Sequence, residues 1–134
     1  MTSTAVVVDA SAIIALLIDP GEPGERIAAR LGSAHLHAPD HLPVEVTNVL
    51  RRQRNAGALS EAEARLAIDG LWSLPMQLWP LEAFASRVWQ LGHNVSSYDG
   101  AYIALAERID APLLTADARL ARAVGPQCAF ELIT

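Results

Sequence analysis

The amino-acid sequence predicts an α/β fold in which a parallel β-sheet is covered by helices on both faces. Short β-branched or apolar runs alternate with helical patterns along the chain, which is typical of βα units around a buried parallel sheet. The chain has 134 residues, of which 51% are hydrophobic. A chain of this size buries roughly two-thirds of its unfolded surface, so we expect one globular domain over residues 1–134.

Five short apolar segments are predicted to form the strands of this sheet. The first is a β-branched run, and the fourth is a continuous apolar run that fits a fully buried strand. The predicted strands are Thr4–Val8, His35–Ala38, Met76–Trp79, Pro112–Thr115 and Ala129–Ile133.

The third predicted helix contains the most informative local signals. Asp40 is expected to cap it, and Pro43 fits its first turn, where a missing N–H costs little. The helical pattern continues to about Asn55, and Gly57 is expected to stop it.

Capping and spacing patterns place the other helices. Ser60-Glu61-Ala62-Glu63 has the spacing of a capping box, whereas the prolines and glycines of residues 19–24 predict a loop. The other predicted helices are Ala12–Ile18, Glu25–Leu31, Ser60–Trp72, Leu81–Leu91, Tyr98–Ile109 and Ala118–Val124.

Composition excludes several classes of function. Cys128 is the single cysteine, so a disulfide scaffold is excluded, and all ten basic residues are arginine. Without lysine there is no Schiff-base chemistry and no phosphate-loop lysine. The longest uncharged apolar stretch, Ala12–Ile18, is far shorter than the roughly 20 residues of a membrane span. The N-terminus lacks the features of a secretory signal, so we expect a cytoplasmic protein.

Two aspartates directly follow predicted strands. Asp9 ends the Val-Val-Val-Asp run, and Asp117 closes the run Leu-Leu-Thr-Ala-Asp. Ligands of open parallel sheets bind at the carboxyl ends of the strands, so both residues are expected near a functional site. Asp99, at the start of a later helix, is a third candidate, and the sequence leaves open which edge of the sheet it faces.

Glu45 is the most informative acid. Leu42 lies three residues before it and Val49 four residues after it, so helical spacing places the carboxylate on an apolar stripe. Burying such a group costs several kcal/mol unless a cation or hydrogen-bond donors compensate. A metal ion shared by several acids would compensate that charge.

Each acid also has a purely structural interpretation. Asp9 and Asp117 could cap the helices that follow them, and Asp99 could favour the positive end of its helix dipole. Glu45 could pair with Arg52 or reach solvent. The joint pattern of strand-end acids and an acid on an apolar stripe favours the chemistry of a hard cation.

At these residues the chain resembles the PIN-domain ribonucleases, and within them the VapC-type toxins of bacterial toxin–antitoxin pairs. Four segments carry the resemblance, in the order and at the spacing of the family. They are Val6–Ala12, His37–Arg52, Ser97–Glu107 and Leu113–Leu120.

The resemblance implies a three-layer α/β/α sandwich in which Asp9, Glu45, Asp99 and Asp117 hold Mg²⁺ or Mn²⁺ as catalytic residues. It also implies cleavage of RNA to 5′-phosphate and 3′-hydroxyl ends, a homodimer, and inhibition by a cognate VapB-type antitoxin that inserts a basic side chain near the acids. Some PIN proteins carry a further acid after the fourth segment, whereas Ala-Arg-Leu follows Asp117 here.

Hydroxyl and arginine side chains extend the predicted site. Ser11 and Thr115 are expected to donate hydrogen bonds to the metal ligands, or they are ordinary residues at the start of a helix. Arginines are expected to bind RNA phosphates, although those near residue 52 could instead stabilise the negative end of their helix. The candidates are Arg51, Arg52, Arg54, Arg119 and Arg122.

Two other functions remain open at this point. A receiver-like phosphoacceptor domain also uses carboxylates at strand ends with Mg²⁺, but it needs a lysine that this chain lacks. A PIN fold that binds RNA without cutting it, as a scaffold, is the second alternative.

Overall fold

A wholly parallel five-stranded sheet forms the centre of the computed structural model, which describes residues 4–133. The strand order is β3-β2-β1-β4-β5, with Val8 opposite Leu114 and His37 opposite Gln77. All five predicted strands are confirmed, with ends shifted by at most one residue. They are β1 (Ala5–Val8), β2 (His35–Pro39), β3 (Met76–Trp79), β4 (Leu113–Thr115) and β5 (Phe130–Leu132).

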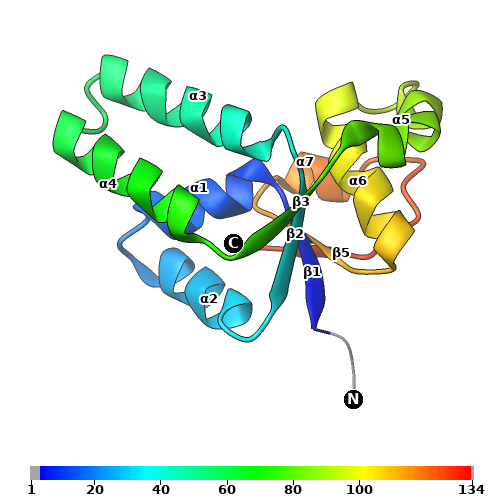
Figure 1. Ribbon diagram of the computed structural model, residues 1–134, viewed down its shortest axis with the longest axis horizontal. Coiled ribbons are helices and arrows are strands. Elements are labelled where there is room, and N and C mark those ends of the chain that lie inside the picture. Colours follow the sequence, from blue (N-terminus) through cyan, green and yellow to red (C-terminus); the bar gives the residue numbers. More distant parts are fainter. Residues whose placement is uncertain (1–3, 134) are drawn as a thin grey trace.

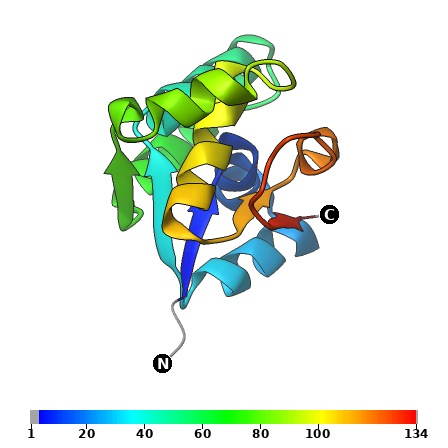
Figure 2. The ribbon, with the colours of Figure 1, turned by 90° about the vertical axis from the view of Figure 1, so that its right-hand side faces the viewer.

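Helices cover both faces of the sheet, which confirms the three-layer α/β/α sandwich (Figures 1 and 2). One face carries α1 (Ala10–Ile18), α2 (Glu22–Leu31), α3 (Leu42–Asn55) and α4 (Glu61–Ser73). The other face carries α5 (Ala85–Leu91) and α6 (Ser97–Ile109), and the short α7 (Ala118–Ala121) contacts β4 and β5.

The core is densest around β1 and α6. Val6, Val7 and Val8 are fully buried because β1 is the central strand. In α6 every residue from Gly100 to Ala106 is buried, and a helix that is apolar nearly all round packs inside a protein. The core therefore fixes β1, which Asp9 follows, and α6, whose first turn contains Asp99.

The prediction of a loop through residue 24 was wrong at its end. Helix α2 begins at Glu22, and Pro23 lies in its first turn, where a proline is tolerated. Gly24 is buried directly against the backbone carbonyl of Asp19, at a spacing that leaves no room for a Cβ atom. Pro23 and Gly24 therefore lie inside the first turn of α2, and the prediction that these residue types mark a loop was wrong here.

The predicted cap of α3 was also wrong. His41 occupies the N-cap position and makes no capping bond with its side chain. Asp40 instead extends the pairing with β3, because its backbone N–H donates to the carbonyl of Trp79 at 2.8 Å. The end of the helix is as expected, since Gly57 adopts φ of +79°.

Two further helices are shorter than predicted. The segment predicted as Leu81–Leu91 contains a 3₁₀ turn, η1 (Leu81–Ala83), then a break at Phe84 and then α5. The last helix, α7, ends at Ala121. The capping box at the start of α4 is confirmed.

Within residues 4–133, no helix is long and apolar enough to cross a membrane.

Candidate active site

The carboxyl ends of β1 and β4 bring two of the predicted acids to one edge of the sheet. The two strands are direct neighbours, and the backbone N–H of Asp9 donates to the carbonyl of Leu114 at 3.2 Å. Asp9 follows β1, and Asp117 follows β4 after one intervening residue. Parallel strands therefore place both carboxylates at the same edge.

The first turns of α3 and α6 add Glu45 and Asp99 to this edge. Burial raises the pKa of Asp99, the negative charges of Glu45 and Asp117 raise it further, and Arg119 lowers it. Burial also raises the pKa of Asp9, with a smaller contribution from Asp99. Asp99 therefore lies within electrostatic range of Asp9, Glu45 and Asp117, and we call these four acids the acid cluster.

Asp9 is the most buried member of the acid cluster, at 5% exposure. Its Oδ1 accepts hydrogen bonds from the Ser11 hydroxyl at 2.6 Å and from the Ala12 backbone N–H at 3.0 Å. Its Oδ2 accepts from the hydroxyl of Thr115. All three donors are neutral, and they oppose the rise in the pKa of Asp9 without cancelling its charge.

The two hydroxyl residues also connect the strand ends to each other. Thr115 Oγ1 accepts from the backbone N–H of Asp117 at 3.0 Å, and Ser11 Oγ accepts from the backbone N–H of Ala116 at 2.9 Å. The two hydroxyl oxygens lie 3.3 Å apart. Ser11 and Thr115 thus contact a predicted metal ligand, as the sequence led us to expect.

Glu45 has two aromatic neighbours that sequence reasoning missed. The hydroxyl of Tyr102, a residue only 1% exposed, donates to Glu45 Oε1 at 3.3 Å. His41 Nε2 lies 2.7 Å from the same oxygen, but the contact lacks hydrogen-bond alignment, and this buried nitrogen has no hydrogen-bond partner among residues 4–133. The alternative pairing of Glu45 with Arg52 is not found among those residues.

The sequence contains a partial signal for the positions of His41 and Tyr102. His41 is four residues before Glu45, and Tyr102 is three residues after Asp99, so each shares a helix face or a first turn with a predicted acid. The contact between Tyr102 and Glu45 joins α6 to α3, and no local pattern predicts it.

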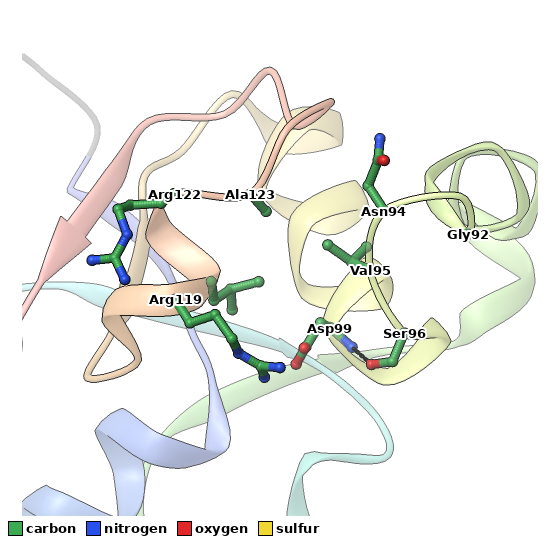
Figure 3. A pocket seen from close by; sticks show the side chains of 9 residues that line it. Gly92, Asn94, Val95, Ser96, Asp99, Arg119, Arg122 and Ala123 are labelled. Carbon is green, nitrogen blue, oxygen red and sulfur yellow. Dashed lines mark hydrogen bonds between the residues drawn. The ribbon is translucent and has the colours of Figure 1, made fainter.

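Asp99 borders a cavity of about 570 Å³ between α7 and the loop before α6, which Arg119 also lines (Figure 3). Asp117 Oδ1 accepts from the backbone N–H groups of Arg119 and Leu120, and its Oδ2 lies 3.5 Å from Arg119 Nη2. In Figure 3 the Arg119 guanidinium points toward the carboxylate of Asp99. Arg119 is therefore the predicted phosphate contact that the structure brings to the acids.

The arginines of α3 lie farther away. Arg51 bonds to Asn48, and Arg54 lies 3.5 Å from Glu61. They follow Glu45 by six and nine residues, which is about 9 to 13 Å along a helix. Arg52 lies between them in the same part of α3. By this spacing all three residues lie toward the far end of α3 from Glu45. Arg122 lines the cavity beside Asp99.

The chemistry of the acid cluster fits a hard divalent ion, because carboxylate oxygens are the ligands that Mg²⁺ and Mn²⁺ prefer. Within residues 4–133, however, no three acidic, histidine or cysteine side chains stand close enough together to form a ready coordination shell. The negative charges of the acids interact with one another. Carboxylate oxygens of Asp9, Glu45 and Asp117 already accept hydrogen bonds from the protein. Ion binding at this edge requires side-chain adjustment.

Comparison with known proteins identifies the family of this chain. The PIN domain family model matches residues 6–126. This chain belongs to the PIN domain family. Ribonuclease VapC12 of Mycobacterium tuberculosis is 38% identical over 128 residues, which cover 96% of this chain and 98% of the relative. Ribonuclease VapC1 of the same organism is 39% identical, with 95% and 96% covered. This PIN-domain chain therefore groups with the VapC ribonucleases.

A solved structure supports the fold independently. VapBC2 from Rickettsia felis, bound to a DNA fragment from the promoter, matches with a TM-score of 0.68 at 10% identity, and the match covers 97% of this chain and 99% of that one. At that identity the likeness concerns the fold alone.

The raised pKa of Asp99 predicts how this PIN-domain protein responds to pH. The native state holds the Asp99 proton more tightly than the unfolded state, so the free energy of unfolding falls as pH rises from 3.8 through the raised pKa. Asp99→Asn removes this loss. In EDTA, we expect the variant to have a Tm a few degrees above wild type at pH 7 and equal to it near pH 3.

Glu107→Gln is the control of opposite sign. Burial alone would raise the pKa of Glu107, but hydrogen bonds from Arg87 and from the Gln127 N–H lower it. This carboxylate stabilises the native state above its unfolded pKa, so the variant should melt below wild type at pH 7 and converge with it in acid. An Asp99→Asn protein that melts below wild type at pH 7 contradicts the electrostatic account.

Proposed function

We propose that this PIN-domain protein is a divalent-metal-dependent endoribonuclease and the toxin of a toxin–antitoxin pair. The observation that carries the proposal is the convergence of four carboxylates from four separate segments at the switch point of a parallel sheet. The similarity to VapC ribonucleases over nearly the whole chain supports RNA as the substrate.

Asp9, Glu45, Asp99 and Asp117 are assigned as the ligands of Mg²⁺ or Mn²⁺ and as the catalytic residues. An ion held there supplies Lewis-acid activation of water and of phosphodiester oxygens. Ser11 and Thr115 hold the carboxylate of Asp9 in one orientation through their hydrogen bonds.

Arg119 fits the binding of the RNA backbone. Its side chain is exposed and lies beside Asp99 and Asp117, so a phosphate at the acid cluster is within reach of a cation on the protein. A guanidinium matches the geometry of phosphate oxygens. We assign weaker contacts with the phosphates of longer RNA to the arginines of α3, because they lie toward the end of that helix far from Glu45. They are Arg51, Arg52 and Arg54.

The partner proteins follow from the relatives. VapBC2 of Rickettsia felis, a structural neighbour of this chain, is bound to a DNA fragment from the promoter. We assign to this chain a VapB-type antitoxin, whose basic side chain would enter the negative acid cluster, and a homodimeric state. We also propose that the protein acts on RNA in the cytoplasm.

Replacement of single acids tests the nuclease assignment. With single-stranded RNA and Mg²⁺ or Mn²⁺, Asp9→Asn and Asp99→Asn should each lower kcat about 100-fold or more, because a group that stabilises transition-state charge is lost. Products should carry 5′-phosphate ends. Asp69→Asn, an exposed site on α4, is the matched control and should cleave like wild type. Unchanged cleavage by Asp99→Asn, or RNA binding without cutting, overturns the assignment.

Ion binding can be measured without RNA. Mn²⁺ at 100 times its Kd should stabilise the native state by about 2.7 kcal/mol, which a rise in Tm reports. Asp9→Asn should lose most of that rise, and Asp69→Asn should keep it. An equal rise in all three proteins, or the same rise with NaCl at matched ionic strength, means that the acid cluster does not bind the ion.

The assignment of Arg119 predicts a change in salt dependence. For single-stranded RNA, each phosphate contact contributes about 0.7 to the slope of log Kd against log salt concentration. Arg119→Gln should reduce the slope by about that amount, while Arg65→Gln, at an exposed position of α4, should leave it unchanged. Arg54→Gln tests the arginines of α3 in the same assay. A slope unaffected by Arg119→Gln removes this residue from the binding surface.

A further inference from the structure

Tyr98 is an exposed aromatic residue directly beside the acid cluster. It precedes Asp99 in the first turn of α6, and 66% of its surface is exposed. A single exposed apolar side chain needs no explanation by itself. Tyr98 differs from the other exposed aromatic residues because its ring belongs to an ordered group of rings that reaches an acid.

Three rings lie in sequence from solvent to the interior. The rings of Tyr98 and His41 have centroids 5.8 Å apart, and those of His41 and Tyr102 have centroids 4.9 Å apart. Tyr102, the inner ring, is buried and donates its hydroxyl to Glu45. The Tyr98 ring therefore packs at a tilt against His41, which packs at a tilt against Tyr102, so the ring contacts link Tyr98 to the residues that contact Glu45. We call these three side chains the ring column.

We propose that Tyr98 stacks on the base of a nucleotide next to the scissile phosphate, an inference that rests on the proposed nuclease function. The acid cluster and Arg119 offer partners for the phosphodiester backbone, but they offer nothing apolar to a base. Tyr98 offers an aromatic face one residue from Asp99. The phosphate and the base of a nucleotide thus both find complementary groups at this edge.

Stacking on Tyr98 selects unpaired RNA. Bases in single strands, loops and bulges can be splayed out onto an aromatic side chain, whereas bases inside a duplex are already stacked and paired. The stack tolerates any base because every base has an aromatic face. Tyr98 therefore helps the protein to select single-stranded over double-stranded RNA. It does not select the identity of the base, which depends on other contacts.

The test combines a change in the protein with a change in the RNA. Tyr98→Ala should raise KM for a short single-stranded RNA about tenfold, a typical loss for one base–aromatic stack, with kcat within about twofold of wild type. Tyr98→Phe keeps the ring and should behave like wild type. Trp72→Ala, which removes an aromatic side chain of α4 that is also 66% exposed, is the matched control and should leave KM unchanged.

An RNA with an abasic site next to the cleaved bond identifies the partner of the ring. For wild type, one abasic position should raise KM about tenfold, and Tyr98→Ala should add no further loss at that position. Additive losses at every position, or an equal loss in Tyr98→Phe, overturn the proposal. An unchanged KM together with weaker binding of an antitoxin overturns it in favour of a protein partner.

A binding measurement separates this inference from the nuclease proposal. In EDTA, RNA that carries 2-aminopurine should show fluorescence quenching by wild type and by Tyr98→Phe, and none by Tyr98→Ala. If wild type cuts no RNA but the ring-dependent quenching is present, the nuclease proposal fails and stacking stands. If wild type cuts RNA without ring-dependent quenching, stacking fails and the nuclease proposal stands.

Discussion

The constraint on which the site depends is a buried negative charge that the protein leaves without a cation. Asp9 is almost fully buried, yet among residues 4–133 its oxygens accept hydrogen bonds from two hydroxyl groups and one backbone N–H and from no cation. Away from the site, the same chain pairs carboxylates with arginine, as in Glu107 with Arg87 and Glu131 with Arg30. Neutral donors orient Asp9 while preserving its charge, and that charge is what attracts a divalent ion.

The strand order explains why the acids converge at this edge. In the order β3-β2-β1-β4-β5, the chain builds outward from β1 in one direction and from β4 in the other. The loops after β1 and β4 therefore meet at the switch point of the sheet, the usual ligand position in an open parallel sheet, and the Ala116 N–H donates to Ser11 Oγ across it. Asp9 and Asp117 follow these two strands at the switch point, and the first turns of α3 and α6 bring Glu45 and Asp99 to the same edge.

Local patterns in the sequence predicted the strands, the strand-end acids and the capping box, because each depends on residues within a few positions. These patterns failed where a contact between residues far apart in the sequence determines the local structure or the partner of a side chain. Asp40 has the chemistry of a helix cap, but pairing with β3 takes its N–H and leaves His41 at the N-cap. The partner of Glu45 was sought nearby, at Arg52, and is Tyr102, which lies 57 positions away. Periodicity carries no information about such a pair.

The two interpretations of the strand-end acids, helix cap and metal ligand, turn out to be compatible. Asp9 caps α1 and Asp117 caps α7. A carboxylate has about four acceptor sites, so the capping bonds leave acceptor sites free on both residues. The capping bonds also restrict the side-chain rotamers before any ligand arrives, which lowers the entropy lost on binding. Asp99 and Glu45 do not cap their own helices, whose N-caps are Ser96 and His41, so no capping bond restricts these two side chains.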